Sequence, residues 1–211
     1  DPVLLVQWAR ERARAVDYKS IQDMTAGQVA ALEAAVAKSP GDRDARQKAL
    51  DFYFSADFKH KVVGWDEKLV ARRRHILWVI AHDPGGSMLR GWRTISPAFD
   101  PTGYAQAKKL WIEATSSKDV ALPVLRNAAN FFQSTDKPLV ESILLRAEER
   151  DPGGPSPRVK DDVYYRSWSG WLGSLYARSI IEVTPGEAQP SEASAKVTEA
   201  DRAFAKESRQ K

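Results

Sequence analysis

The chain has 211 residues, 43% of them hydrophobic, and its 32 basic and 28 acidic residues leave a formal net charge of +4. This length and composition are typical of folded proteins, and they exclude disordered and collagen-like chains. The small basic excess is spread along the chain and is weak evidence for nucleic-acid binding. Because no cysteine is present, disulfides, thiolate metal sites and cysteine nucleophiles are excluded.

The sequence predicts no membrane span. The longest apolar stretch, residues 76–81, is far shorter than the roughly 20 residues that cross a bilayer. We therefore expect no membrane insertion. The chain begins at Asp1 without an initiator methionine and lacks cysteine, which slightly favours an exported protein, periplasmic or secreted.

Stretches with helical periodicity follow one another along the chain, and no long β-branched alternation predicts a strand. In chain order, we predict helices at residues 29–37, 45–54, 70–82, 103–114, 124–131, 140–150 and 171–176. Loops are predicted at residues 55–61, 96–103 and 153–160. A segment rich in Pro, Ser, Glu and Ala at 181–196 predicts a flexible linker, and 197–211 predicts a terminal helix that begins a truncated unit.

A four-residue corner recurs along the chain. Asp83-Pro84-Gly85-Gly86 returns as Asp151-Pro152-Gly153-Gly154 after 68 residues, which is twice a 34-residue repeat. A related corner, Ser39-Pro40-Gly41-Asp42, lies upstream. Each corner follows a predicted helix, and a proline followed by glycine favours a chain reversal there. The corners therefore predict helix ends.

Residues 123–153 carry the most complete repeat motif. Apolar and small residues fall on one face of each of two predicted helices, at Val124, Ala128, Phe131, Val140, Leu144 and Ala147. With Asp136 in the intervening turn and Pro152 after the second helix, this window resembles one unit of the tetratricopeptide (TPR) family. Asn127 departs from the family pattern, which usually has leucine there.

Three further segments match the family pattern in part. They contain Ala49, Leu50 and Tyr53; Ala107, Trp111 and Ala114; and Leu172, Gly173 and Tyr176. The best-matching units lie within residues 28–178. The resemblance implies an all-α fold in which residues 1–180 form a TPR-like domain, a right-handed superhelical solenoid of antiparallel helix pairs with degenerate units.

The TPR resemblance also implies a scaffold or adaptor that binds a protein or peptide through the concave face of the repeat array. Carried over by position, the groove would include Gln47, Asp51, Phe54, Asn130, Gln133 and Arg178. The family's lysine and asparagine clamp for C-terminal carboxylates is not reproduced. We expect a monomer with no cofactor and no enzymatic activity.

Two other functions stay open. Arg72, Arg73 and Arg74 form the densest basic cluster, which could contact a nucleic acid or another polyanion. Such a run is more often a solvated face paired with neighbours, here Asp66 and Glu67, so nucleic acid is not the expected partner. The third hypothesis, a helical enzyme, lacks a recognisable acid–base pair.

Neither histidine nor tryptophan residues reveal a definite site. His75 and His82 are separated by about 10.5 Å along a helix, too far to share one metal ion, and we interpret both as surface or helix-terminal residues. Trp78 and Trp111 occupy core-like positions. Three further tryptophans lie near turns or insertions: Trp65, Trp92 and Trp168. An aromatic side chain in such a place can anchor a partner, although core packing is favoured for these three.

Overall fold

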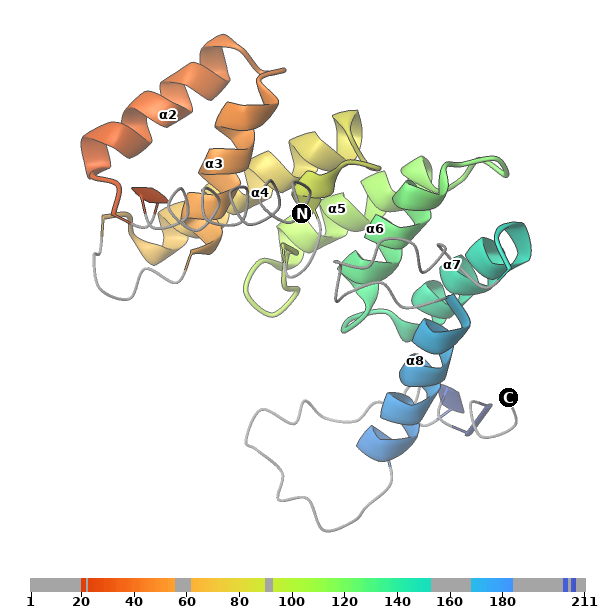
Figure 1. The fold of residues 1–211 in the computed structure, drawn as a ribbon. Helices are drawn as coiled ribbons and strands as arrows, with labels where there is room; N and C mark the ends of the chain where they lie inside the picture. The colour runs from red at the N-terminus through yellow and green to blue at the C-terminus, as the bar shows by residue number, and fades with distance from the viewer. Residues whose placement is uncertain are drawn as a thin grey trace, which may run out of the picture. The chain divides into compact units, whose positions relative to one another are not determined.

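The computed structural model describes residues 20–21, 23–55, 62–89, 93–152, 168–183, 203–204 and 206–207, with only the backbone for 178–183. All regular structure in these ranges is helical (Figure 1). The elements are α2 (Ala26–Lys38), α3 (Arg43–Phe54), α4 (Trp65–His82), the short 3₁₀ helix η1 (Ser87–Leu89), α5 (Pro101–Ala114), α6 (Leu122–Phe132), α7 (Lys137–Arg150) and α8 (Trp168–Val183). The all-α prediction is therefore confirmed for the described residues, and each predicted helical stretch falls within one of these helices.

Two segments predicted as irregular are partly helical. Residues 101–103 of the predicted loop begin α5, and residues 181–183 of the predicted linker end α8. Pro101 suits the first position of α5, because its missing N–H would have no partner inside the helix. Three predicted irregular stretches lie outside the described residues: 184–196 of the linker, 56–61 and 153–160. Most of the predicted terminal helix also lies outside them, and its described residues, 203–204 and 206–207, are helical.

The chain divides into two compact units, Asp1–Ile112 and Glu113–Lys211. In the first unit, α2 packs against α3 and α3 packs against α4. In the second unit, α6 packs against α7 and α7 packs against α8. Helices that neighbour each other in sequence thus pack together, and the short connections at residues 39–42 and 133–136 make αα-hairpins of α2 with α3 and of α6 with α7.

The three proline corners end their helices in the same way. Ser39, Asp83 and Asp151 follow α2, α4 and α7, and each has a φ between −132° and −148° with a ψ between 54° and 78°. Each backbone N–H still bonds the carbonyl oxygen four residues earlier, at distances of 3.0, 2.7 and 3.0 Å. The proline that follows disfavours the α conformation at the residue before it. The predicted helix ends are confirmed at all three corners.

Side-chain caps begin α2, α3 and α7. The Thr25 hydroxyl accepts a hydrogen bond from the backbone N–H of Gln28, and the Gln28 side chain accepts one from the Thr25 N–H, which forms a capping box before α2. Asp42 caps α3 and Asp136 caps α7 in the simpler manner, each accepting one backbone N–H. The turn position predicted for Asp136 is thus confirmed.

The second unit buries the positions that carry the TPR resemblance. Ala128 on α6 and Leu144 and Ala147 on α7 are fully buried. Small residues at such positions allow two helices to approach closely. The remaining members of the set, Val124, Phe131 and Val140, are also buried. The burial of these residues agrees with the apolar faces predicted for the two helices, while the TPR-like arrangement stays a prediction.

The tryptophans differ in burial. Trp111 is fully buried, as predicted, and Trp168 also belongs to the core at 1% exposure. Trp78 is only partly buried. Trp65 is 54% exposed, so the core packing favoured for it is wrong. Trp92 lies outside the described residues.

Candidate functional site

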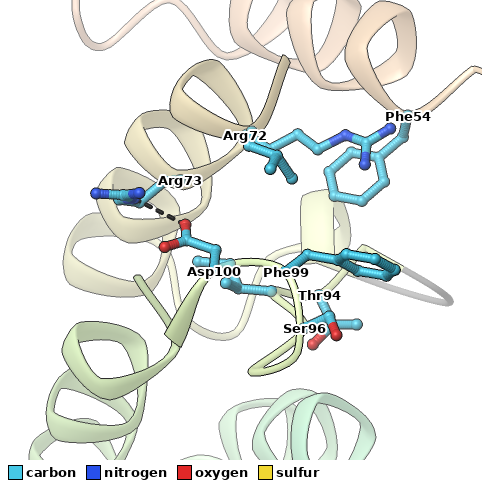
Figure 2. Close-up of a pocket in the computed structure, with 9 residues that line it drawn as sticks. Phe54, Arg72, Arg73, Thr94, Ser96, Phe99 and Asp100 are labelled. Carbon is cyan, nitrogen blue, oxygen red and sulfur yellow. Dashed lines mark hydrogen bonds and ion pairs between the residues drawn. The ribbon is translucent and has the colours of Figure 1, made fainter. Parts of the chain in front are cut away.

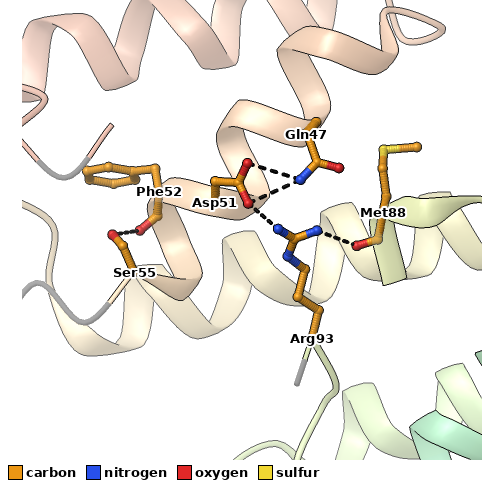
Figure 3. Close-up of polar contacts among 6 residues, drawn as sticks. All are labelled: Gln47, Asp51, Phe52, Ser55, Met88 and Arg93. Atoms are coloured by element: carbon orange, nitrogen blue, oxygen red, sulfur yellow. Dashed lines mark hydrogen bonds and ion pairs between the residues drawn. The ribbon is translucent and has the colours of Figure 1, made fainter. Parts of the chain in front are cut away.

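Two of the predicted groove residues bind each other. The Gln47 side-chain amide donates to both carboxylate oxygens of Asp51 at 3.1 and 3.0 Å (Figure 3). Arg93 also donates to the Asp51 carboxylate, and it donates to the Met88 carbonyl oxygen at 2.8 Å. These contacts attach the segment after η1 to α3, so the Asp51 carboxylate already has intramolecular partners.

The other predicted groove residues are distributed over both units. Phe54 is 7% exposed and belongs to the first unit. Asn130 is partly buried and Gln133 is exposed, and both lie at the end of α6 in the second unit. Arg178 lies on α8, where its side chain is outside the described set. Among the described side chains of the first unit, Gln47 and Asp51 are joined directly by hydrogen bonds.

The three consecutive arginines of α4 have three different partners. The Arg72 Nε donates to the Tyr53 carbonyl oxygen at 2.8 Å. Arg73 pairs with Asp100 at 2.7 Å, and Arg74 pairs with Glu33 at 2.6 Å. The expected partners, Asp66 and Glu67, are therefore the wrong ones: a helix turns about 100° per residue, so consecutive side chains reach different neighbouring elements.

A pocket of about 240 Å³ lies in the first unit between α4 and the segment before α5. Figure 2 shows Arg72 and Phe54 across the pocket from Phe99, with the Arg73–Asp100 pair at one end. Its walls combine apolar and polar side chains: Phe54, Leu69, Arg72, Arg73, Thr94, Ile95, Ser96, Phe99 and Asp100.

Two exposed aromatic rings lie beside this pocket. Trp65 at the start of α4 is 54% exposed, and Phe99 is 64% exposed. Their ring centroids are 5.8 Å apart and their planes meet at 83°, an edge-to-face pair. Exposed large aromatic side chains at a concave surface are typical of sites that anchor a partner. We refer to Trp65 and Phe99 as the aromatic pair.

Asp100 holds the Arg73 wall of the pocket in place. Its Oδ1 accepts the backbone N–H of Gly103 at 2.9 Å, so it caps α5, and its Oδ2 accepts from Arg73. Asp100 is only 5% exposed. Glycine at 103 leaves room for this carboxylate, because a Cβ there would lie 2.2 Å from Asp100 Oδ2.

We expect Asp100→Ala to lower the free energy of unfolding by about 2 kcal/mol, since it removes both a helix cap and the partner of Arg73. Asp100→Asn keeps an oxygen for the cap and should lose about 1 kcal/mol. Urea unfolding followed by circular dichroism measures both variants. Equal losses for the two would show that the cap contributes nothing.

A second polar cluster joins α2, α3 and α4. The Glu33 Oε1 accepts hydrogen bonds from the Tyr53 hydroxyl at 2.7 Å and from His75 Nε2 at 3.0 Å. His75 Nδ1 lies 3.1 Å from an Arg46 terminal nitrogen, which can only donate. His75 Nδ1 must therefore be the acceptor, so its proton is on Nε2. We call Glu33, Arg46, Tyr53 and His75 the buried network.

The surroundings shift the pKa values of the buried network. Burial raises the pKa of Glu33, but hydrogen bonds from His75 and Tyr53, with the electrostatic attraction of Arg74, outweigh it and lower the pKa from 4.5 to about 2. Burial and the hydrogen bond to Glu33 raise the pKa of Tyr53. Burial lowers the pKa of Arg46, whose guanidinium also lies 3.7 Å from the Trp78 ring centroid. Glu33 is therefore ionised at neutral pH.

His75 corrects the histidine interpretation. It is fully buried and both ring nitrogens are engaged, because residues 42 and 29 positions away in sequence supply its partners. His82, by contrast, is exposed at the last residue of α4, as predicted. A hollow of about 610 Å³ lies beside the network, lined in part by Glu33, Arg46 and Trp78. His75 is not among the residues that line it. This arrangement suits a structural role, in which the hydrogen bonds of the buried network connect α2, α3 and α4.

Neither a metal centre nor a membrane span is found in the described part of the chain. No group of three or more metal-ligating side chains comes together there. None of the described helices has the length and apolar character to cross a membrane. No family model matches the sequence, and no curated protein or solved structure does so significantly.

Sequence reasoning missed Phe99 and the buried network. Phe99 lies in a segment predicted as a loop, between Ala98 and Asp100, and only its large apolar side chain distinguishes it there. Glu33 and His75 have no local pattern, because they meet only when α2 and α4 both pack on α3. The prediction that Trp65 lies near a turn is confirmed, because Trp65 is the first residue of α4.

Proposed function

We propose that this chain is a protein- or peptide-binding scaffold of the TPR-like class, and that the pocket of the first unit is a point of contact. The observation that carries the proposal is the aromatic pair of Trp65 and Phe99, both more than half exposed beside a pocket. Exposing two large aromatic rings to water is unfavourable, and covering them with a partner recovers the hydrophobic free energy.

The helical architecture supports the same function. Pairs of neighbouring helices and repeated proline corners are typical of a repeat array, whose exposed faces hold extended peptides. The proposed TPR-like stacking would continue this pattern from one helix pair to the next.

Polyanion binding through Arg72, Arg73 and Arg74 is the alternative, and it has less support. Two of these side chains already pair with carboxylates, so phosphate groups would have to displace Asp100 and Glu33. Binding of a fluorescent oligonucleotide that weakens steeply with salt would favour this alternative, because phosphate contacts release counterions.

The proposed function is tested with a library of random peptides displayed on phage. We expect the purified chain to enrich peptides that share a large apolar residue, and Trp65→Ala to weaken their binding about tenfold or more, because aromatic anchors dominate such contacts. Affinity is measured by fluorescence anisotropy of the enriched peptides.

Val70→Ala is the matched control for Trp65→Ala. Val70 lies on the same helix and is equally exposed at 54%, but it does not line this pocket. Binding to this variant should be unchanged. The proposal fails if no peptide is enriched, or if enriched peptides bind Trp65→Ala as tightly as the unaltered chain.

A further inference from the structure

Arg72 is the basic side chain of the pocket that lacks a carboxylate partner among the described residues. Arg73 and Arg74, its neighbours on α4, pair with Asp100 and Glu33. The hydrogen bond of Arg72 is made by Nε to the Tyr53 carbonyl oxygen. This leaves the positive charge of Arg72 without a neutralising group in the described part of the first unit.

Aromatic rings hold the Arg72 guanidinium in a definite position. Its central carbon lies 4.6 Å from the Phe54 ring centroid and 5.6 Å from that of Trp65. Cation–π contacts of this kind orient the planar guanidinium without using its terminal N–H groups. The group is therefore pre-positioned beside the aromatic pair and ready to donate to an additional acceptor.

The Arg72 environment also favours an anion. The side chain is partly buried, and burial lowers its pKa because the charged form loses contact with water. A carboxylate accepts two parallel hydrogen bonds from a guanidinium and would compensate this loss. An anionic group bound here would therefore stabilise the charged form of Arg72, which burial disfavours.

The rest of the pocket suits an apolar side chain. Phe54, Leu69 and Ile95 supply apolar walls, and the volume is about 240 Å³. Since a cavity of about 150 Å³ can hold benzene, this pocket has room for one large side chain. The apolar walls and Arg72 line the same pocket, so adjacent residues of one extended peptide can reach both.

We propose that the pocket recognises a peptide in which an aspartate or glutamate lies next to a large apolar residue, with the carboxylate on Arg72 and the apolar side chain between Phe54 and the aromatic pair. This inference rests on the proposed function, because it names the peptide class that the same pocket selects. The recognised group is a side-chain carboxylate, so a free C-terminus is not required.

The test repeats the phage selection on three proteins: the unaltered chain, Arg72→Lys and Lys48→Gln. We expect the unaltered chain to enrich an acidic residue next to the apolar anchor. Arg72→Lys should lose most of this enrichment, because a lysine ammonium cannot form the two parallel bonds. Lys48 is exposed on α3, so its variant removes one positive charge away from the pocket and should select as the unaltered chain does.

A second measurement does not depend on the folding of any variant. The strongest enriched peptide is synthesised with an amidated C-terminus, and its acidic residue is exchanged for the corresponding amide. We expect this exchange to weaken binding to the unaltered chain about tenfold or more, since hydrogen bonds to charged groups are the stronger ones. Against Arg72→Lys the two peptides should differ several-fold less.

The outcomes separate the two proposals. Peptides that need Trp65 but show no acidic preference, or that bind equally well after the amide exchange, overturn the inference about Arg72 and leave the scaffold proposal standing. Failure to enrich any peptide that depends on Trp65 overturns both. Acidic enrichment that persists in Arg72→Lys assigns the carboxylate to another group and also overturns the inference.

Discussion

Glu33→Gln is expected to lower the free energy of unfolding by about 3 kcal/mol at neutral pH. The Glu33 carboxylate accepts from Tyr53 and His75 and pairs with Arg74, and these interactions lower its pKa from 4.5 to about 2. A glutamine has almost the same shape but carries no charge and offers one oxygen in place of two. It would leave the buried His75 N–H and Arg74 with a weaker partner.

The pH dependence of this loss has a definite sign. Because the pKa of Glu33 is lower in the folded chain than in the unfolded chain, its stabilisation is fully present above pH 4.5 and is lost as the pH falls towards 2. The unaltered chain should therefore lose stability across this window more steeply than Glu33→Gln. Near pH 2 the two should be almost equally stable.

Urea unfolding at several pH values measures this difference. Glu113→Gln is the matched control, since Glu113 is exposed and removing its charge should change stability by less than about 0.5 kcal/mol. A Glu33→Gln variant with the same acid dependence as the unaltered chain would contradict the role assigned to the buried network.

Leu144→Ala is expected to lower the free energy of unfolding by about 3 kcal/mol, within the range found for buried leucines. Leu144 is fully buried on α7, where this helix packs against α6 and α8. Removing its branched end would leave a cavity between helices whose close approach depends on Ala128 and Ala147. A rigid interior fills such a cavity only in part.

The adjacent residue supplies the control. Leu145 has the same chemistry but is 50% exposed, so Leu145→Ala should change stability by less than about 0.5 kcal/mol. Thermal and urea unfolding of both variants give the comparison. Similar losses at the two positions would mean that α7 does not present the face deduced from the repeat motif.

Local rules explain which parts of the fold could be predicted. Helical periodicity, the turn at Asp136 and the corners before Pro84 and Pro152 depend on residues within about four positions of one another. The structure confirms the predicted helical stretches, the helix ends at the proline corners and the buried set that includes Leu144. For the same reason, the exposed end of α4 at His82 could be predicted.

Other features depend on residues far apart in sequence. His75 has a helical position that would suit a surface histidine, yet it is fully buried because Glu33 and Arg46 meet it from two other helices. The basic run of α4 suggests one positive surface, but Arg73 and Arg74 are directed to carboxylates on different elements.

The sequence by itself determined that the regular structure of the described residues is helical, that helices end at the three proline corners, and which face of α6 and α7 is apolar, because hydrogen bonds and side-chain periodicity along a helix act over a few residues. Tertiary structure alone decided that Glu33 and His75 form a pair, that Trp65 and Phe99 meet beside a pocket, and that Arg72 is left without a carboxylate among the described residues. These outcomes depend on the angle and separation at which helices pack. Many side chains share in setting that packing, so no short motif encodes it.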